Sequence, residues 1–428
     1  MIDPSEGQGP AAAVQALGVP GPVASGLAAV LGPDAAQRVA TDPWLVLEAG
    51  DVTPVQADRF AAGRLGGLDP GDPRRVVALC RWVIRRVGHS GATLVAREVV
   101  LAALAGLGLG ESAVAVAVEH GGVVATADGS LLALAEVAAA EQELAGHVER
   151  AGTQGADRLL VVSGPPGPWR DAAVAAAAGE GTTGGGTTSG GTTGGGTTLI
   201  RDRAERLDTH AVLALLREVG DGGRVVLAGD PCARHAAPGR VLADLVERDR
   251  VAVRRVEAHA STALGRLATA VRVGRLEPAD PAEHSLVVAP VDSVEKARHR
   301  VLQLVSDSIP GRLGLGAAHI AVVTLRETGP LGAGALRGHL QAEGVHVRVS
   351  RVDELDESPV PAVVLVLAAD ATGSLERTML VSAVGAASAH LSVVTQVGSV
   401  LAQALARPPA VPRTGLAARL GPLEGSAG

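Results

Sequence analysis

The chain has 428 residues, a net charge of −7, two cysteines, three tryptophans, one phenylalanine and no tyrosine. This length allows two or three domains with hydrophobic cores, and the negative charge argues against binding of nucleic acid by bulk electrostatics, although a local basic face stays compatible with it. The distant cysteines predict no disulfide framework, the acidic N-terminus predicts no secretory signal, and no uncharged apolar run approaches the roughly 18 residues of a membrane span, so we expect a cytoplasmic protein without a membrane partner.

Short helices broken by glycine and proline are expected over residues 18–70. The segment Asp72–Gly88 predicts a longer amphipathic helix, because apolar residues recur at helical spacing from Val76 to Val87. A basic face lies opposite this apolar stripe, formed by Arg74, Arg81 and Arg85. These arginines are candidate DNA contacts, and the alternative is an ordinary solvated helix surface. Further helices with a small β-wing at Gly121–Ala127 are expected over residues 93–150.

The stretch from Arg158 to Asp171 has the frame of a phosphate-binding loop. Leu159–Ser163 predicts a buried strand, and an alanine-rich helix is expected at Ala172–Ala178. Between them stands the turn formed by Gly164, Pro165, Pro166 and Gly167. Strand, glycine turn and helix make the frame in which backbone N–H groups and a helix N-terminus bind phosphate. An ordinary β–α turn is the alternative interpretation.

The residues that carry the chemistry of such a loop are replaced. In the pattern GxxxxGK[ST], Gly164 is the first glycine, and Trp169, Arg170 and Asp171 stand at the last three positions. We expect Trp169 to obstruct the phosphate site, since only glycine lets the backbone approach phosphate closely. Arg170 keeps a positive charge without the point geometry of lysine, and Asp171 puts a carboxylate where a neutral hydroxyl would hold Mg²⁺.

Five near-continuous apolar runs predict central strands of parallel sheets, because such strands are buried on both faces. These runs are residues 159–163, 225–228, 285–289, 320–324 and 362–367. Residues 181–198 contain only glycine, threonine and one serine. Because such a stretch cannot bury a core, we expect it to be a flexible tether.

Several segments match a known family in the order of that family. The most specific is Pro238–Leu245, which reads PGRVLADL; others are GVPGPVA at residues 18–24, GPLGAGAL at Gly329–Leu336, and the run Met379–Val394. From about residue 18 to about residue 400, the chain resembles the RecD-like superfamily 1 DNA helicases, relatives of the exodeoxyribonuclease V alpha subunit. By the same resemblance, Leu131–Ala151 corresponds to the helix that leads into the ATPase core.

The resemblance implies an α/β fold, with two RecA-like parallel-sheet domains of the P-loop NTPase type preceded by an all-α helix-hairpin-helix region. It implies a helix-hairpin-helix region at 1–70, a helical and winged region at 71–151, and RecA-like domains at 152–278 and 279–411. The Gly/Thr linker 181–198 lies inside the first of these domains. We expect residues 412–428 to be a disordered tail.

The resemblance also implies ATP and Mg²⁺ as the cofactors of the family, and it identifies the positions where this chain departs. Asp202 survives as the magnesium-side carboxylate, whereas Arg203 stands at the position of the glutamate that orients the attacking water. Ala233 replaces the glutamine that senses the γ-phosphate, and Ala386 replaces the arginine finger. No residue is therefore expected to be catalytic. A vestigial nucleotide site would consist of Gly164–Gly167, Arg170, Asp171 and Asp202.

An acidic cluster stands where the family has the motif that couples DNA to ATP. It reads Asp353-Glu354-Leu355-Asp356-Glu357. Carboxylates could hold a metal ion, but we interpret this cluster as a solvated loop. No His/Cys spacing typical of a metal site occurs in the sequence.

Three functions stay open. Residues that build the fold persist while those that touch ATP, water or DNA are replaced, which favours a catalytically dead RecD-like protein that binds DNA weakly or binds another protein, without a cofactor. The resemblance connects such a protein with DNA repair. The second function is an ATP-dependent 5′–3′ DNA helicase with divergent motifs. The third is a nucleotide binder without hydrolysis, which would use Gly164–Gly167 and Asp202.

Overall fold

The computed structural model describes residues 9–50, 52–88, 91–154, 158–178, 190–193, 196–220, 222–235, 238–257, 262–276, 283–355 and 359–421. The chain divides into two compact units. The first consists of Met1–Gln142, Ala237–Gly239 and Pro412–Gly415, and the second of Glu143–Ala236, Arg240–Val411 and Leu416–Gly428. Both sheets discussed below belong to the second unit, so the finer division into four domains stays a prediction.

The first unit is mainly helical, and the short helices predicted to be broken by glycine and proline over residues 18–70 are present. Its helices are α1 (Pro10–Gln15), α2 (Gly21–Leu31), α3 (Ala35–Thr41), η1 (Pro43–Ala49), α4 (Pro54–Leu65), α5 (Pro73–Val87), α6 (Arg97–Ala105) and α7 (Ser112–Glu119). Side-chain caps set several of the starts: Thr53 begins α4 with a capping box, and Asp72 begins α5 by accepting the backbone N–H of Arg74. The amphipathic helix expected at Asp72–Gly88 is confirmed.

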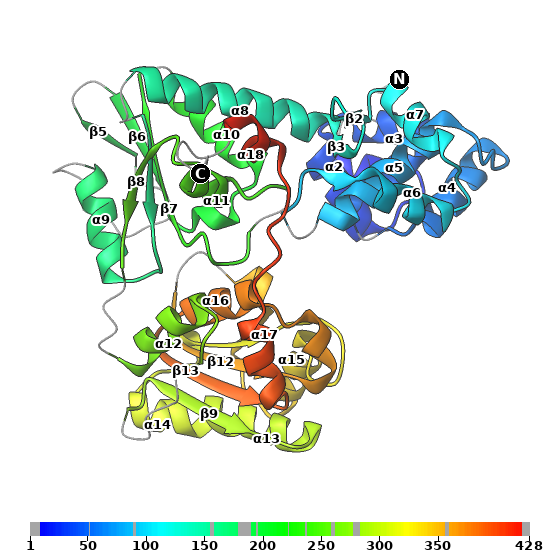
Figure 1. Ribbon diagram of the computed structural model, residues 1–428. Helices are drawn as coiled ribbons and strands as arrows, with labels where there is room; N and C mark the ends of the chain where they lie inside the picture. Colours follow the sequence, from blue (N-terminus) through cyan, green and yellow to red (C-terminus); the bar gives the residue numbers. More distant parts are fainter. Residues whose placement is uncertain are drawn as a thin grey trace, which may run out of the picture. The chain divides into compact units, whose positions relative to one another are not determined.

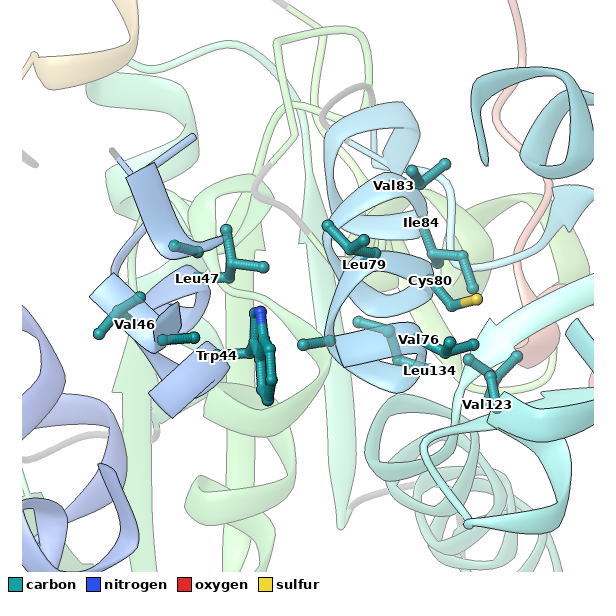
Figure 2. Packing of buried hydrophobic residues seen from close by; sticks show 14 of the residues in the cluster. Trp44, Val46, Leu47, Val76, Leu79, Cys80, Val83, Ile84, Val123 and Leu134 are labelled. Carbon is teal, nitrogen blue, oxygen red and sulfur yellow. The ribbon is translucent and has the colours of Figure 1, made fainter. Parts of the chain in front are cut away.

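The core of this unit is built around Trp44 (Figure 2), whose side chain is fully buried. Figure 2 shows the indole beside Leu47 of the same 3₁₀ helix and opposite Leu79 of α5. The indole Nε1 donates a hydrogen bond to Asp58 Oδ1 at 2.9 Å. Asp58 in turn forms an ion pair with Arg75 at 2.8 Å, so the polar edge of this core residue is satisfied inside the unit.

A small antiparallel sheet completes the first unit. It consists of β1 (Val95–Ala96), β2 (Val123–Ala125) and β3 (Leu131–Leu134), in the order β1-β3-β2. The β-wing expected at Gly121–Ala127 is thereby confirmed. The long helix expected from Leu131 is wrong for its first four residues: helix α8 spans Ala135–Gln154. Leu131–Leu134 pairs with both β1 and β2, and this tertiary pairing overrides the local helical pattern.

The first large sheet has the strand order β5-β6-β7-β4-β8. Its strands are β4 (Leu159–Ser163), β5 (Gly190–Thr193), β6 (Gly196–Arg201), β7 (Arg224–Gly229) and β8 (Ala252–Arg255). All neighbours pair in parallel except β5 and β6. Alternate residues of β4 and β7 enter two different cores, so both strands are buried on both faces and read as continuous apolar runs.

Helices cover both faces of this sheet. Helix α9 (Pro168–Ala178) packs on one face, and α8, α10 (Thr209–Val219) and α11 (Val241–Arg248) pack on the other. Figure 1 shows α9 on the opposite side of the strands from α10 and α11. The short 3₁₀ helix η3 (Ala204–Arg206) follows β6 directly.

The second large sheet is wholly parallel, with the order β11-β10-β12-β13-β9. Its strands are β9 (Leu286–Pro290), β10 (Ile320–Thr324), β11 (Arg348–Arg351), β12 (Val360–Leu367) and β13 (Ala387–Thr395).

Helices cover both faces of the second sheet. One face carries α12 (Ala263–Arg272), α16 (Arg377–Gly385) and α17 (Ser399–Ala406). The other face carries α13 (Val294–Gln303), the π-helical η4 (Leu304–Ser308), α14 (Ile309–Leu313) and α15 (Ala333–Ala342). The remaining short elements are η5 (Ala317–His319), η6 (Val352–Glu354), η7 (Ala369–Ser374) and α18 (Gly415–Leu420).

The predicted α/β class with two parallel-sheet regions behind a helical N-terminal region is confirmed, and it is consistent with RecA-like domains. All five apolar runs form parallel strands. The prediction that each is central is wrong for residues 285–289, because β9 lies at the edge of its sheet. Val288 of this strand is 48% exposed, so an apolar run alone did not distinguish an edge strand from a central one.

Two predictions of disorder do not hold for the residues that the structure describes. Residues 190–193 and 196–198 of the Gly/Thr stretch form β5 and the start of β6, where Thr198 pairs with Arg224 of β7; the rest of 181–198 lies outside the described residues. Threonine is β-branched and suits a strand once a neighbouring strand is available. The expected tail 412–428 contains α18, whose Leu416 and Leu420 are buried in the core of the first sheet; residues 422–428 lie outside the described part.

Candidate functional site

The candidate site lies at the carboxyl ends of the strands of the first sheet, where the order in which the strands are added reverses. After β4 the chain builds β6 and β7 on one side, and after β7 it crosses β4 to form β8 on the other side. In open parallel sheets, ligands bind at the carboxyl ends of the strands beside such a reversal. The loops that begin there carry Gly164–Gly167, Asp202 with Arg203, and Asp230. The fold therefore brings the residues predicted to form a vestigial nucleotide site to the same end of the sheet, at the carboxyl ends of its strands.

Gly164 has a packing reason that is independent of phosphate. Its backbone N–H donates to Gly229 O at 2.9 Å, which ties the start of the loop to the end of β7. A Cβ at this position would lie 2.4 Å from Val256 O, the backbone that follows β8. No side chain fits at that distance, so close contact between adjacent strands already requires glycine here.

Arg170 is the side chain that occupies the interior behind the loop. It is only 1% exposed, its Nη2 lies 2.7 Å from Asp202 Oδ1, and its Nη1 donates to Gly164 O at 3.2 Å. The expectation that Trp169 obstructs the phosphate site is not supported, because the indole is 54% exposed whereas Arg170 is buried. The two residues are neighbours at the start of α9, and the long arginine side chain reaches inward to the carboxylate of Asp202.

Asp171 and Asp202 lie close enough to influence one another. Burial raises the pKa of Asp171, and the charge of Asp202 raises it further, while Arg170 works in the opposite direction. The positive charge beside Asp202 is thus supplied by the protein itself. Arg170 therefore neutralises the carboxylate that the resemblance assigns to Mg²⁺.

Arg203 adopts a backbone conformation that is uncommon for a side chain of its size. Its φ is +51°, in the left-handed region, and the residue is buried. Its Nη2 donates to Gly385 O, the last residue of α16, at 3.2 Å. Burial lowers the pKa of Arg203, while Glu205 favours its charged form. The neighbour of Gly385 is Ala386, the predicted finger position, whose methyl group is buried and carries no charge.

Two buried carboxylates belong to this site although neither was predicted as a site residue. Glu205 accepts a hydrogen bond from the backbone N–H of Asp230 at 3.1 Å, and Asp230 pairs with Arg272 Nη2 at 3.1 Å. Burial raises the pKa of both carboxyl groups, and nearby arginines oppose this effect. For Asp230 the available signal was its place directly after the strand that ends at Gly229. For Glu205 the available signal was a carboxylate between Arg203 and Arg206 directly after a predicted strand.

The space enclosed by these groups is very small. The cavity has a volume of about 10 Å³ and is lined by Pro166, Arg203, Glu205, Arg206, Asp230, Ala233, Val381, Ser382 and Gly385. Ligand pockets commonly measure about 300–1,000 Å³, and about 10–15 Å³ holds a single water. The residues present do not fit Mg-ATP: the loop cation is paired with Asp202, and the space lined in part by Arg203 and Arg206 has room for about one water.

The predicted DNA-binding arginines lie in the first unit and are held by its own carboxylates. Arg81 forms ion pairs with Glu48 at 3.0 Å and Glu136 at 2.8 Å, and Arg85 also pairs with Glu48. Although burial acts in the opposite direction, Arg85 and Arg81 hold the pKa of Glu48 below its ordinary value. Arg74 pairs with Asp72 at 2.6 Å, and its guanidinium lies 5.5 Å from the centre of the Trp44 ring.

The acidic cluster is partly described. Asp353 and Glu354 form ion pairs with Arg351 at 3.3 and 3.0 Å, whereas Asp356 and Glu357 lie outside the described residues. Within the part of the chain that the structure describes, no group of three or more His, Cys, Asp or Glu side chains could hold a metal ion. Among the described helices, none has both the length and the apolar character needed to cross a bilayer.

No protein-family model matches the chain, and no curated protein matches it. Part of the chain is similar to two solved structures: the crystal structure of Arterivirus nonstructural protein 10 (helicase), and the complex structure of the same protein with DNA. The first is 15% identical, covers 65% of this chain and 71% of its own, and has a TM-score of 0.29. The second is 15% identical, covers 66% and 73%, and has a TM-score of 0.30. At these TM-scores the likeness does not place the chain in that group.

Proposed function

We propose that the protein is a catalytically degenerate relative of the RecD-like DNA helicases, a module that binds DNA or another protein and does not hydrolyse ATP. The observation that carries this proposal is the buried Arg170, which pairs with Asp202 at 2.7 Å behind a loop whose cavity has a volume of about 10 Å³. The parallel-sheet fold is retained, while the groups that would act on a nucleotide are engaged in internal contacts. The fold therefore serves as a scaffold in this proposal.

The chemistry of phosphoryl transfer explains why these changes matter. Catalysis depends on cations placed around the β- and γ-phosphates, on Mg²⁺ and on an oriented water. Here the loop cation is bound to Asp202, Arg203 stands at the water-orienting position, and Ala386 offers no guanidinium. An arginine finger alone contributes about 10³–10⁵ in rate, so its loss is severe even if nucleotide were bound.

The proposal is tested by measuring phosphate release and thermal shift with Mg-ATP, in the presence and absence of single-stranded DNA. We expect neither steady-state turnover nor a shift. Turnover that is lost in the Asp202→Ala variant would establish the helicase alternative instead. A nucleotide-dependent shift without turnover would establish the non-hydrolysing nucleotide binder.

A variant that restores the phosphate-binding pattern at residues 169–171 gives a more specific test of the same proposal. Replacing Trp169 with Gly, Arg170 with Lys and Asp171 with Thr frees Asp202 and opens the loop, so some Mg-ATP binding is expected as a thermal shift. Turnover is not expected while Arg203 and Ala386 remain. Arg217→Lys, on the exposed surface of α10, is the matched control and should show neither effect. Turnover in the reconstructed loop alone would contradict the assigned roles of Arg203 and Ala386.

Any DNA binding is expected to be weak and sensitive to salt. The chain has only four Trp and Phe side chains, of which Trp44 is fully buried, and Arg81 and Arg85 share the carboxylate of Glu48. If the α5 arginines bind phosphate, the Arg81→Gln/Arg85→Gln variant should weaken binding and reduce the slope of log K against log salt by about 0.7–0.9 for each phosphate that is no longer neutralised. Fluorescence anisotropy measures this, with the exposed Arg312→Gln as the control. Nanomolar binding unchanged by the double substitution would refute the assignment.

A further inference from the structure

The two sheets of the second unit are joined by polar contacts around the small cavity that Arg203 and Arg206 line. Arg203 and Arg206 follow β6 of the first sheet, and each donates to a backbone carbonyl beside the second sheet. Arg203 Nη2 lies 3.2 Å from Gly385 O at the end of α16, and Arg206 Nη2 lies 3.2 Å from the carbonyl oxygen of Val352, the first residue of η6 directly after β11. Both arginines therefore connect the segment after β6 to elements of the second sheet.

Further contacts reinforce the same connection. Asp230, at the end of β7, pairs with Arg272 of α12, a helix packed on the second sheet. The backbone N–H of Arg234 donates to Ser382 Oγ of α16 at 2.9 Å. Each of these contacts joins a residue that follows β7 to a helix packed on the second sheet.

The hydrogen bond from Arg203 to Gly385 O stabilises the C-terminal end of α16. The last carbonyls of a helix lack partners inside the helix and carry its partial negative charge, which a guanidinium stabilises. Gly385 is the last residue of α16, and the Arg203 side chain that reaches it is buried. Arg203 keeps a strained φ of +51° in this position, and such strain persists only where the surroundings over-determine the conformation.

We infer that Arg203 and Arg206 form an internal clasp that keeps the two sheets closed on one another in place of a bound nucleotide. The resemblance implies an arginine at the position of Ala386 that reaches toward a phosphate. Here the guanidinium of Arg203 instead reaches from the first sheet to the carbonyl of Gly385, the neighbour of Ala386. The inference goes beyond the proposed function, because it assigns a conformational role to the substituted residues. It makes the unit a rigid scaffold rather than a nucleotide-driven motor.

Amide hydrogen exchange of the whole protein tests the clasp. In Arg203→Gly, glycine accepts the positive φ without strain, so the local backbone is kept while the guanidinium is removed. Loss of a hydrogen bond to a charged group predicts about tenfold to a hundredfold faster exchange at residues 384–387, with β4 and β10 unchanged. Arg206→Ala should accelerate exchange around residues 352–355 in the same way. The control Arg217→Ala removes an exposed arginine of α10, a helix packed on the first sheet, and should change neither region.

Small-angle X-ray scattering provides the second readout. The unmodified protein should give the same curve with and without Mg-ATP, and Arg203→Gly/Arg206→Ala should give a larger radius of gyration. Unchanged exchange at residues 384–387 and 352–355, together with an unchanged radius, would overturn the clasp. If Arg203→Gly also accelerates exchange in β4, Arg206→Ala alone decides, since its side chain is less buried. A radius that changes with Mg-ATP in the unmodified protein would likewise overturn the inference, while phosphate release reports separately on the proposed function.

Discussion

The Asp244→Ala variant is expected to lose about 3–5 kcal/mol of stability in the first sheet, because the substitution removes the buried one of the two carboxylates that pair with a buried arginine. Arg240 and Asp244 are 4% and 2% exposed, and Arg240 Nε lies 2.9 Å from Asp244 Oδ1. Asp244 also stands in the first turn of α11, where a negative charge is stabilised by the helix dipole. Amide exchange of β4 and β7 measures the loss and should accelerate by at least about two orders of magnitude.

Glu247→Ala is the matched control for this prediction. Glu247 is a second carboxylate beside Arg240, but its side chain is 50% exposed. Exposed ion pairs contribute about 0–1 kcal/mol, so the control should change the exchange of β4 and β7 less than about tenfold. Equal effects of the two substitutions would show that the buried pair is not what stabilises this part of the chain.

Trp44→Ala is expected to destabilise the first unit by about 3–5 kcal/mol, the usual cost of removing a large buried aromatic side chain. The substitution opens a cavity between Leu47 and Leu79, and it also leaves Asp58 without the indole donor (Figure 2). Protection of the Leu47 and Leu79 amides against hydrogen exchange should fall by about two to three orders of magnitude.

The exposed Trp169 offers the corresponding control in the second unit. Trp169→Ala changes the same side chain type at a site that is 54% exposed, and surface substitutions commonly stay within about 0.5 kcal/mol. Protection of the β4 amides should therefore stay nearly constant. Trp44→Phe separates packing from hydrogen bonding, since phenylalanine fills most of the volume but donates nothing to Asp58. A Trp44→Ala protein with unchanged protection would contradict the central place of this residue in the core.

Packing in the first sheet explains the residues of the motif Pro238–Leu245. The motif is the most specific match to the RecD-like family, and the structure gives its residues a packing explanation. Val241, Leu242 and Leu245 are buried in the core of the first sheet, and Arg240 pairs with Asp244 beside them. These contacts stabilise the fold whether or not a nucleotide binds, so persistence of the motif carries no information about ATP.

The sequence by itself determined the α/β class and the position of the central strands, because burial on both faces requires continuous apolar runs such as Leu159–Ser163 and Ile320–Thr324. It also located the loop that begins at Gly164 and the substitutions at Arg170 and Arg203. These are local properties: a strand, a turn and a change of residue type can each be recognised within a few positions of the chain.

Only the tertiary structure decided what those substituted residues do. Whether Arg170 reaches Asp202, and whether Arg203 reaches Gly385, depends on partners that lie 32 and 182 positions away along the chain. The edge position of β9 and the pairing of Thr198 with β7 depend in the same way on neighbouring strands. Hydrophobic periodicity records whether a residue is buried, but the partner of a buried charge is fixed by packing between distant segments, and no local pattern encodes it.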